Sequence, residues 1–153
     1  MITSINLNCE ENLFVGIGND LIDIRRIGRV LEKYNKRFLN RIYTEEELRK
    51  AASRKKSNKL YISTLAKRFA AKEATAKALG TGFRNGVFWR DIGVLNLSSG
   101  KPTIKMTGGA KKQLNSLISE QYLPVIDLTM TDEYPYAEAF VIISAVTKEN
   151  YTY

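Results

Sequence analysis

Apolar and polar positions follow two different spacings near the start of the chain, and the change of spacing predicts a strand followed by a helix. The apolar run Phe14–Gly18 ends in Asn19 and Asp20, as a buried strand leaving a sheet would, so Asp20 is expected at the exit of the strand. From Asp23 onward, apolar residues recur every three or four positions while arginines and lysines occupy the other faces. This segment is predicted to be an amphipathic helix with a basic exterior.

Two further helices carry start or stop signals. Thr44–Glu47 fits a capping box, in which the Thr44 hydroxyl accepts from a backbone amide three residues on and Glu47 reaches back. A helix is predicted from there toward Arg54. The segment Leu60–Leu79 has no glycine or proline, and Gly80 follows it at the position of a C′ cap. This segment is predicted to be the long central helix.

The second half of the chain has mainly the pattern of strands. Asp91–Leu97 and Pro102–Met106 flank the turn-rich link Ser98–Lys101 and predict a hairpin, and Gly108-Gly109 is expected to break the chain. A surface helix and two strands are predicted after it, over residues 110–121, 124–129 and 137–146. The order predicts an α+β fold in which a largely antiparallel sheet packs against the long central helix.

Length and composition indicate a single domain over residues 1–153. The chain has a mass of 17.3 kDa with 44% hydrophobic and 26% charged residues, as folded proteins have. The polar stretch Asn6–Asn12 has the composition of a loose terminal arm, and residues 1–12 are expected to be a flexible N-terminal extension. Uncharged runs do not exceed nine residues, against the roughly 18 to 20 that a membrane-spanning helix needs, and the first 24 residues lack Lys and Arg. We therefore predict a cytoplasmic protein with no membrane partner.

Two residue counts restrict the chemistry. The sequence has no histidine, and Cys9 is its one cysteine. An intrachain disulfide, a cysteine-based zinc site, imidazole metal ligands and Ser–His catalysis are therefore excluded. Any catalysis must use carboxylates, lysines, tyrosines or a hard metal ion.

The positive charge is concentrated in one segment. The formal net charge is +8, and residues 25–59 hold 13 Lys or Arg against 4 Asp or Glu. A localised positive surface attracts a polyanion or an acidic protein. Aromatic residues lie in or near this segment, but no RNA-binding signature accompanies them. A nucleic-acid-binding module and a solvated helical face both stay open as readings of the charge alone.

Glu73 falls on the apolar side of the predicted central helix. An unpaired carboxylate on a buried face costs several kcal/mol, so it must be protonated, paired or close to a metal ion. One interpretation is an i,i+4 pair with Lys77, worth about 0.2 to 0.5 kcal/mol. The other is that Arg68, Lys72 and Lys77 hold a phosphorylated ligand beside a carboxylate-bound Mg²⁺, with Asp20 as the second carboxylate.

Three stretches taken together resemble one family, the holo-acyl-carrier-protein synthases, which are small phosphopantetheinyl transferases. They are GIGNDLIDIRRI over residues 16–27, RFAAKEATAKALGTG over residues 68–82, and GKP over residues 100–102. The similarity extends from about Phe14 to Val146. The combination is specific, whereas each fragment alone is weak.

The resemblance implies the 4′-phosphopantetheinyl transferase fold and a reaction of fatty acid biosynthesis. That reaction is transfer of 4′-phosphopantetheine from coenzyme A to a serine of apo acyl carrier protein, which releases adenosine 3′,5′-bisphosphate. It also implies Mg²⁺ as the metal, with Mn²⁺ as an alternative, and a homotrimer with active sites between subunits. The basic segment then has an acidic protein partner, acyl carrier protein, and no nucleic acid is expected as a partner.

The resemblance assigns roles to residues by position. Asp20 and Glu73 match the two metal-binding carboxylates, and Glu73 is also placed to help deprotonate the serine. Lys77 matches a lysine near the phosphates of coenzyme A, and Arg68 and Lys72 would add positive field there. The residues matched to carrier-protein binding are Arg26, Arg37, Phe38 and Arg41.

The remaining predicted contacts to coenzyme A lie in three short segments. Gly80 and Gly82 belong to the second motif, and the resemblance brings the other residues to the adenosine end, from the same or from different subunits. Many family members have histidine where Met130 stands, so an imidazole contact is lost here. The residues of the adenosine end are Ser99, Gly100, Pro102, Thr129, Met130 and Thr131.

Overall fold

The computed structural model describes residues 13–150, which form an α+β fold. The prediction of a flexible extension over residues 1–12, and Cys9 with it, lies outside these residues. The elements are β1 (Leu13–Asp23), α1 (Ile24–Ile42), α2 (Glu45–Ala52), α3 (Asn58–Ala78), η1 (Trp89–Asp91), β2 (Ile92–Asn96), β3 (Pro102–Met106), α4 (Gly108–Leu117), β4 (Tyr122–Glu133), β5 (Tyr136–Thr147) and η2 (Lys148–Asn150).

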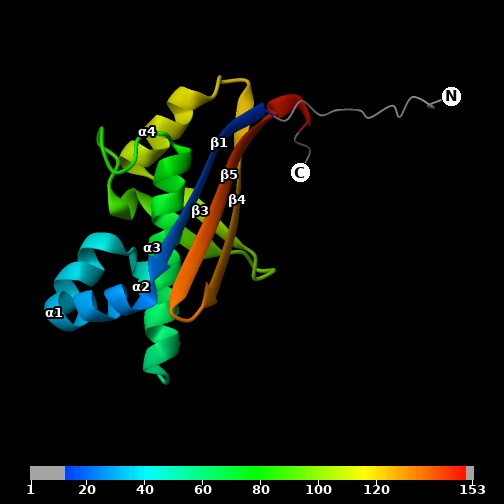
Figure 1. Cartoon of the computed structure of the whole chain (residues 1–153). Coiled ribbons are helices and arrows are strands. Elements are labelled where there is room, and N and C mark those ends of the chain that lie inside the picture. The colour runs from blue at the N-terminus through cyan, green and yellow to red at the C-terminus, as the bar shows by residue number, and fades with distance from the viewer. Residues whose placement is uncertain (1–12, 151–153) are drawn as a thin grey trace.

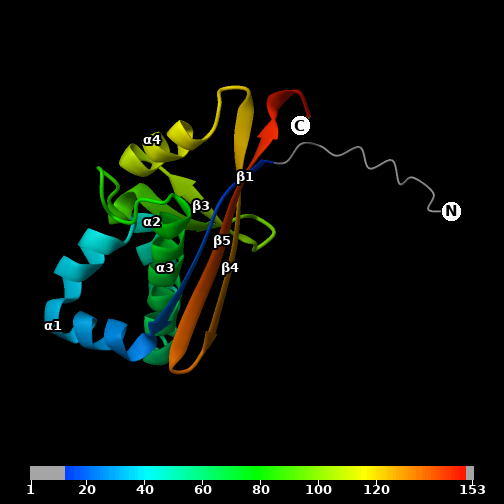
Figure 2. The same ribbon diagram turned by 45° about the horizontal axis from the view of Figure 1, so that its top comes forward.

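The strands form two antiparallel sheets. The larger has the order β1-β5-β4. Strands β2 and β3 form the predicted hairpin, which is a second sheet and not part of the larger one. Helix α3 lies along one face of the larger sheet, and α1 and α2 lie on the side of α3 away from β4 (Figures 1 and 2). The chain therefore surrounds α3, and eleven of its 21 residues are buried.

The predicted helix signals are confirmed. Thr44 accepts from the backbone N–H of Glu47, and the Glu47 carboxylate accepts from the Thr44 N–H at 2.8 Å, which completes the capping box. Gly80 adopts φ 76°, a left-handed conformation that glycine takes at little cost after a helix. Helix α1 differs from the expectation at Asn35, whose φ of 35° divides it into two segments.

Several predicted boundaries were wrong, including that of β4, which extends to Glu133 and not to residue 129. Strand β1 continues to Asp23, so Asp20 lies within the strand and not at its exit. Gly108 and Gly109 begin α4, which ends at Leu117, earlier than predicted.

No helix within residues 13–150 is both long and apolar enough to cross a membrane.

Candidate active site

The two glycines of β1 bring the strand into backbone contact with α3. A Cβ on Gly16 would overlap the carbonyl oxygen of Ala78, and a Cβ on Gly18 would overlap that of Ala74. Two strand residues and one helical turn advance by similar lengths, about 6.8 and 5.4 Å. Because side chains alternate along a strand, Asp20 is the next residue on the face that packs against α3. The glycines therefore position Asp20 beside the C-terminal turns of α3.

Asp20, Glu73 and Lys77 form a cluster at this contact, called here the carboxylate cluster. The Lys77 Nζ donates to Asp20 Oδ1 at 2.8 Å and to the Asn19 carbonyl at 2.8 Å. Glu73 makes no ion pair within residues 13–150 and is half-buried. The expected alternative, a Glu73–Lys77 pair, is therefore not formed, because Lys77 bonds to the strand.

The electrostatics of Glu73 follow from this arrangement. Burial raises the pKa of the Glu73 carboxyl, the neighbouring Asp20 carboxylate raises it further, and Lys77 opposes the shift. A carboxylate with a raised pKa is a better proton acceptor than an ordinary glutamate at neutral pH. Glu73 thus has the character of a general base.

Asp20 and Glu73 also suit a hard divalent cation. Mg²⁺ usually takes one or two protein carboxylates and completes its octahedron with water and substrate phosphates. Residues 13–150 contain no group of three or more His, Cys, Asp or Glu side chains that could hold a metal ion by themselves. The donor set therefore fits Mg²⁺ shared with a phosphorylated substrate better than a fully protein-ligated metal.

A second group of predicted residues meets in a pocket with a volume of about 570 Å³. Arg68, Gly100 and Met130 contribute to it from α3, the β2–β3 turn and β4. We call it the cationic pocket, since it contains four Lys or Arg side chains. Its lining residues are Lys50, Arg54, Thr64, Lys67, Arg68, Asn96, Leu97, Ser98, Gly100 and Met130.

Arg68 is the buried cation of this pocket. It is 4% exposed, its guanidinium donates to Asn96 Oδ1 and the Thr64 carbonyl at 3.3 Å each, and its Nε has no partner within the described residues. A buried guanidinium with unused donor capacity suits an anionic ligand. This pocket is a candidate site for phosphate groups.

The prediction that Lys72 binds coenzyme A was wrong. Lys72 is fully buried, and its Nζ forms an ion pair with Glu47 at 2.8 Å and donates to the backbone carbonyls of Trp89 and Ile92. All three hydrogens of the ammonium are used inside the protein. Lys72 therefore has no donor left for a ligand.

The other predicted contacts lie near one or the other group. Gly80 and Gly82, with φ 76° and 59°, form the turn that follows α3. Ser99 is in the β2–β3 turn, and Pro102 begins β3 opposite Asn96. Thr129 and Thr131 are exposed residues of β4, on either side of Met130.

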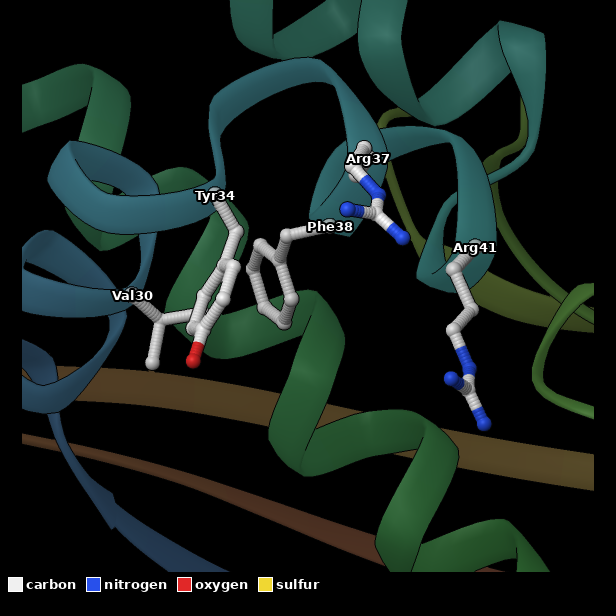
Figure 3. A pocket seen from close by; sticks show the side chains of 5 residues that line it. All are labelled: Val30, Tyr34, Arg37, Phe38 and Arg41. Carbon is white, nitrogen blue, oxygen red and sulfur yellow. The ribbon is translucent and has the colours of Figure 1, made fainter.

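Three of the four residues predicted to bind a carrier protein lie together on α1. Arg37, Phe38 and Arg41 border a groove of about 470 Å³ with Val30 and Tyr34, which we call the docking groove. Figure 3 shows the rings of Tyr34 and Phe38 close together in it, with the guanidinium groups of Arg37 and Arg41 to one side. Arg26 is exposed on α1 outside the groove. An apolar floor with two cations beside it suits an acidic partner with an apolar side chain.

Sequence reasoning missed several residues of these sites. Lys50 and Arg54 follow one another at i,i+4 spacing in the basic segment, and that spacing was the available signal. Asn96 and Ser98 lie in the predicted hairpin and carried no signal, because their proximity to α3 depends on long-range packing.

Comparison with known proteins gives the class. A family model of the 4′-phosphopantetheinyl transferase superfamily matches residues 16–137, and the chain belongs to this superfamily. A relative from a Bradyrhizobium species, named holo-[acyl-carrier-protein] synthase, is 56% identical over 135 residues, which are 88% of this chain and 97% of the relative. A relative of the same name from Nitrobacter hamburgensis is 54% identical over 138 residues, 90% of this chain and 99% of the relative.

Solved structures support the same family assignment. The crystal structure of holo-[acyl-carrier-protein] synthase from Neisseria meningitidis has a TM-score of 0.72 and 39% identity, covering 86% of this chain and 98% of that one. The Bacillus anthracis enzyme in complex with CoA (3′,5′-ADP) has a TM-score of 0.66 and 34% identity, covering 86% and 97%. The chain is thus an enzyme of the holo-[acyl-carrier-protein] synthase type, which confirms the fold and the family that the three motifs indicated.

Proposed function

We propose that this enzyme transfers 4′-phosphopantetheine from coenzyme A to a serine of apo acyl carrier protein at the carboxylate cluster. The observation that carries the proposal is the meeting of Asp20, half-buried Glu73 and Lys77 in a chain of this family. The serine Oγ attacks the phosphorus that carries pantetheine, and the bond from that phosphorus to the adenosine bisphosphate oxygen breaks. Holo carrier protein and adenosine 3′,5′-bisphosphate are the products.

The residues of the cluster have separate roles. Glu73 is half-buried beside the Asp20–Lys77 pair and is placed to accept the proton of the serine hydroxyl. Lys77 places its ammonium where it can neutralise charge that develops on the leaving phosphate. Because a phosphoanhydride already contains a good leaving group, positioning and charge neutralisation supply most of the catalysis.

Asp20 and Glu73 are the residues that would hold Mg²⁺, and Mn²⁺ suits the same oxygen donors. Such an ion would neutralise part of the charge on the diphosphate. Lys77 would then leave Asp20 and turn to the phosphates.

The cytoplasmic location of the enzyme remains a prediction.

The cationic pocket would receive the adenosine end of coenzyme A. Arg68 and Glu73 are five residues apart on α3, so they point about 140° apart around the helix. One extended coenzyme A molecule cannot easily contact both of these sides of α3 in a single chain. A neighbouring copy that supplies the cationic pocket would solve this problem and place the site between subunits.

The sheet provides a surface for such a neighbour. On its face away from α3, Ile17 and Leu21 of β1 are 51% and 60% exposed, and Phe140 and Ile142 of β5 are 38% and 37% exposed. Ile17 lies opposite Ile142 in the ladder, so these side chains form a contiguous apolar face.

This arrangement predicts a trimer. We expect light scattering to give a molar mass three times that of the 17.3 kDa chain. A monomer at micromolar concentration would contradict the trimer.

One assay tests the reaction. The protein is mixed with apo carrier protein, coenzyme A and Mg²⁺, and mass spectrometry should show a carrier that has gained the phosphopantetheine arm. Carrier binding without a mass gain would indicate an inactive scaffold. Salt-sensitive RNA binding without a mass gain would favour the nucleic-acid reading of the basic segment.

The variant Arg41→Glu should raise KM for the carrier roughly tenfold with little change in kcat, because it places a like charge against an acidic partner.

A further inference from the structure

Four aromatic side chains form a row between the docking groove and the turn that follows α3. Phe38 stacks on Phe69 with ring centroids 6.4 Å apart, Phe69 lies 4.7 Å from Trp89, and Trp89 stacks on Phe83 at 3.7 Å. All four are partly exposed at the edge of the core. We call this row the aromatic wall. It joins residues of α1, α3, the turn after α3 and η1 into one uncharged surface.

The aromatic wall borders the carboxylate cluster. Phe69, Glu73 and Lys77 follow one another at i,i+4 spacing, so they lie on adjacent positions about 40° apart around α3. Glu73 therefore has the Asp20–Lys77 pair on one side and Phe69 on the other. Trp89 lies on the side of Phe69, because the centroids of the two rings are 4.7 Å apart.

The two sides of Glu73 differ in chemistry. The side of Asp20 and Lys77 is charged and is closed by the backbone contact between β1 and α3. The side of the aromatic wall is apolar, and it continues into the docking groove through Phe38, which belongs to both. A ligand at Glu73 thus meets charges in one direction and aromatic rings in the other.

We propose that the aromatic wall binds the uncharged pantetheine arm of coenzyme A, an inference that rests on the proposed function of the carboxylate cluster. The arm is attached to the phosphate that is transferred, and it carries a gem-dimethyl carbon and two amides but no charge. Aromatic faces gain from contact with such a group, whereas Lys77 and Asp20 do not. The arm leaves with the carrier protein, so a surface that leads from Glu73 to the docking groove lies on its route.

The test compares two ligands that differ by the arm. Calorimetric titrations with Mg²⁺ present measure coenzyme A and adenosine 3′,5′-bisphosphate on the wild type and on Trp89→Ala. We expect Trp89→Ala to bind coenzyme A roughly tenfold more weakly and to bind the bisphosphate as the wild type does. Phe88→Ala is the matched control, because Phe88 is the adjacent aromatic residue, 69% exposed, and should leave both affinities unchanged.

Other outcomes overturn the inference in distinguishable ways. An equal loss for both ligands would make Trp89 a structural residue, and no loss for either would remove the wall from the binding site. A wild type that binds neither ligand would instead refute the proposed function.

A measurement on the unmodified protein covers the case in which Trp89→Ala does not fold. Trp89 is the only tryptophan of the chain, so its fluorescence reports on the wall directly. Coenzyme A should change the emission excited at the red edge of the tryptophan band, and the bisphosphate, which has the same adenine, should not. Identical responses to the two ligands, or none to either in a protein shown to bind both, would overturn the proposal.

Discussion

Glu73→Gln should reduce kcat by about 10³-fold or more while the protein stays folded. Glutamine has the same shape but cannot accept the proton of the serine and is a poor ligand for Mg²⁺, and loss of a general base alone costs about 10² to 10⁴ in rate. Glu73 makes no ion pair within residues 13–150, so the fold does not depend on its charge. The carrier mass gain followed against time gives the rate, and circular dichroism verifies the fold.

Two further variants make the result specific. Asp20→Asn should cause a loss of similar size, because it removes the second carboxylate and the partner of Lys77. Glu120→Gln, at an exposed position, is the control for a carboxylate removed elsewhere and should leave the rate unchanged. Near-normal turnover of Glu73→Gln would mean that Glu73 is a structural residue and that the catalytic site lies elsewhere.

Lys72→Met should lower the free energy of unfolding by about 3 to 5 kcal/mol, the cost of breaking a buried ion pair by removing one partner. Burial lowers the pKa of Lys72, and the Glu47 carboxylate opposes that shift. Glu47 is itself fully buried and also accepts from the Val94 N–H at 3.1 Å. The pair therefore ties α2, α3 and β2 together, and urea titration followed by circular dichroism measures its loss.

The double variant Glu47→Leu, Lys72→Met separates the pair from the packing around it. It removes both charges of the pair, so neither is left buried without its partner, and it should be more stable than Lys72→Met alone. Lys111→Met, on the exposed surface of α4, should change the free energy of unfolding by no more than about 0.5 kcal/mol. If Lys72→Met unfolds like the wild type and instead raises KM for coenzyme A, the residue binds the donor after all.

The helices were predictable because their signals are local. The capping box at Thr44 and the glycine after α3 are each decided by a few neighbouring residues. The end of β1 was not predictable in this way. Asn19 looked like the end of a strand, yet β1 has one face exposed to solvent, and Asn19 is an outward residue in its middle.

The candidate site was predicted in part for a related reason. Asp20 and Glu73 could be paired because Glu73 stood out as a charge among apolar positions, and the family motifs supplied its partner. Lys72 was misassigned because its partner Glu47 already looked satisfied by the capping box, and only the tertiary structure shows that the same carboxylate serves both. The aromatic wall joins four separate segments, so no single stretch of sequence reveals it.

The contact of Gly16 and Gly18 with the carbonyls of α3 has a consequence for the robustness of catalysis. At these two positions, the spacing between the strand that carries Asp20 and the helix that carries Glu73 is limited by main-chain atoms and not by the shapes of side chains. Substitutions of the surrounding aliphatic residues can therefore lower the thermal stability of the protein. Each correctly folded molecule would still keep its full turnover rate. A methyl group added at either glycine would push the two acidic groups apart directly.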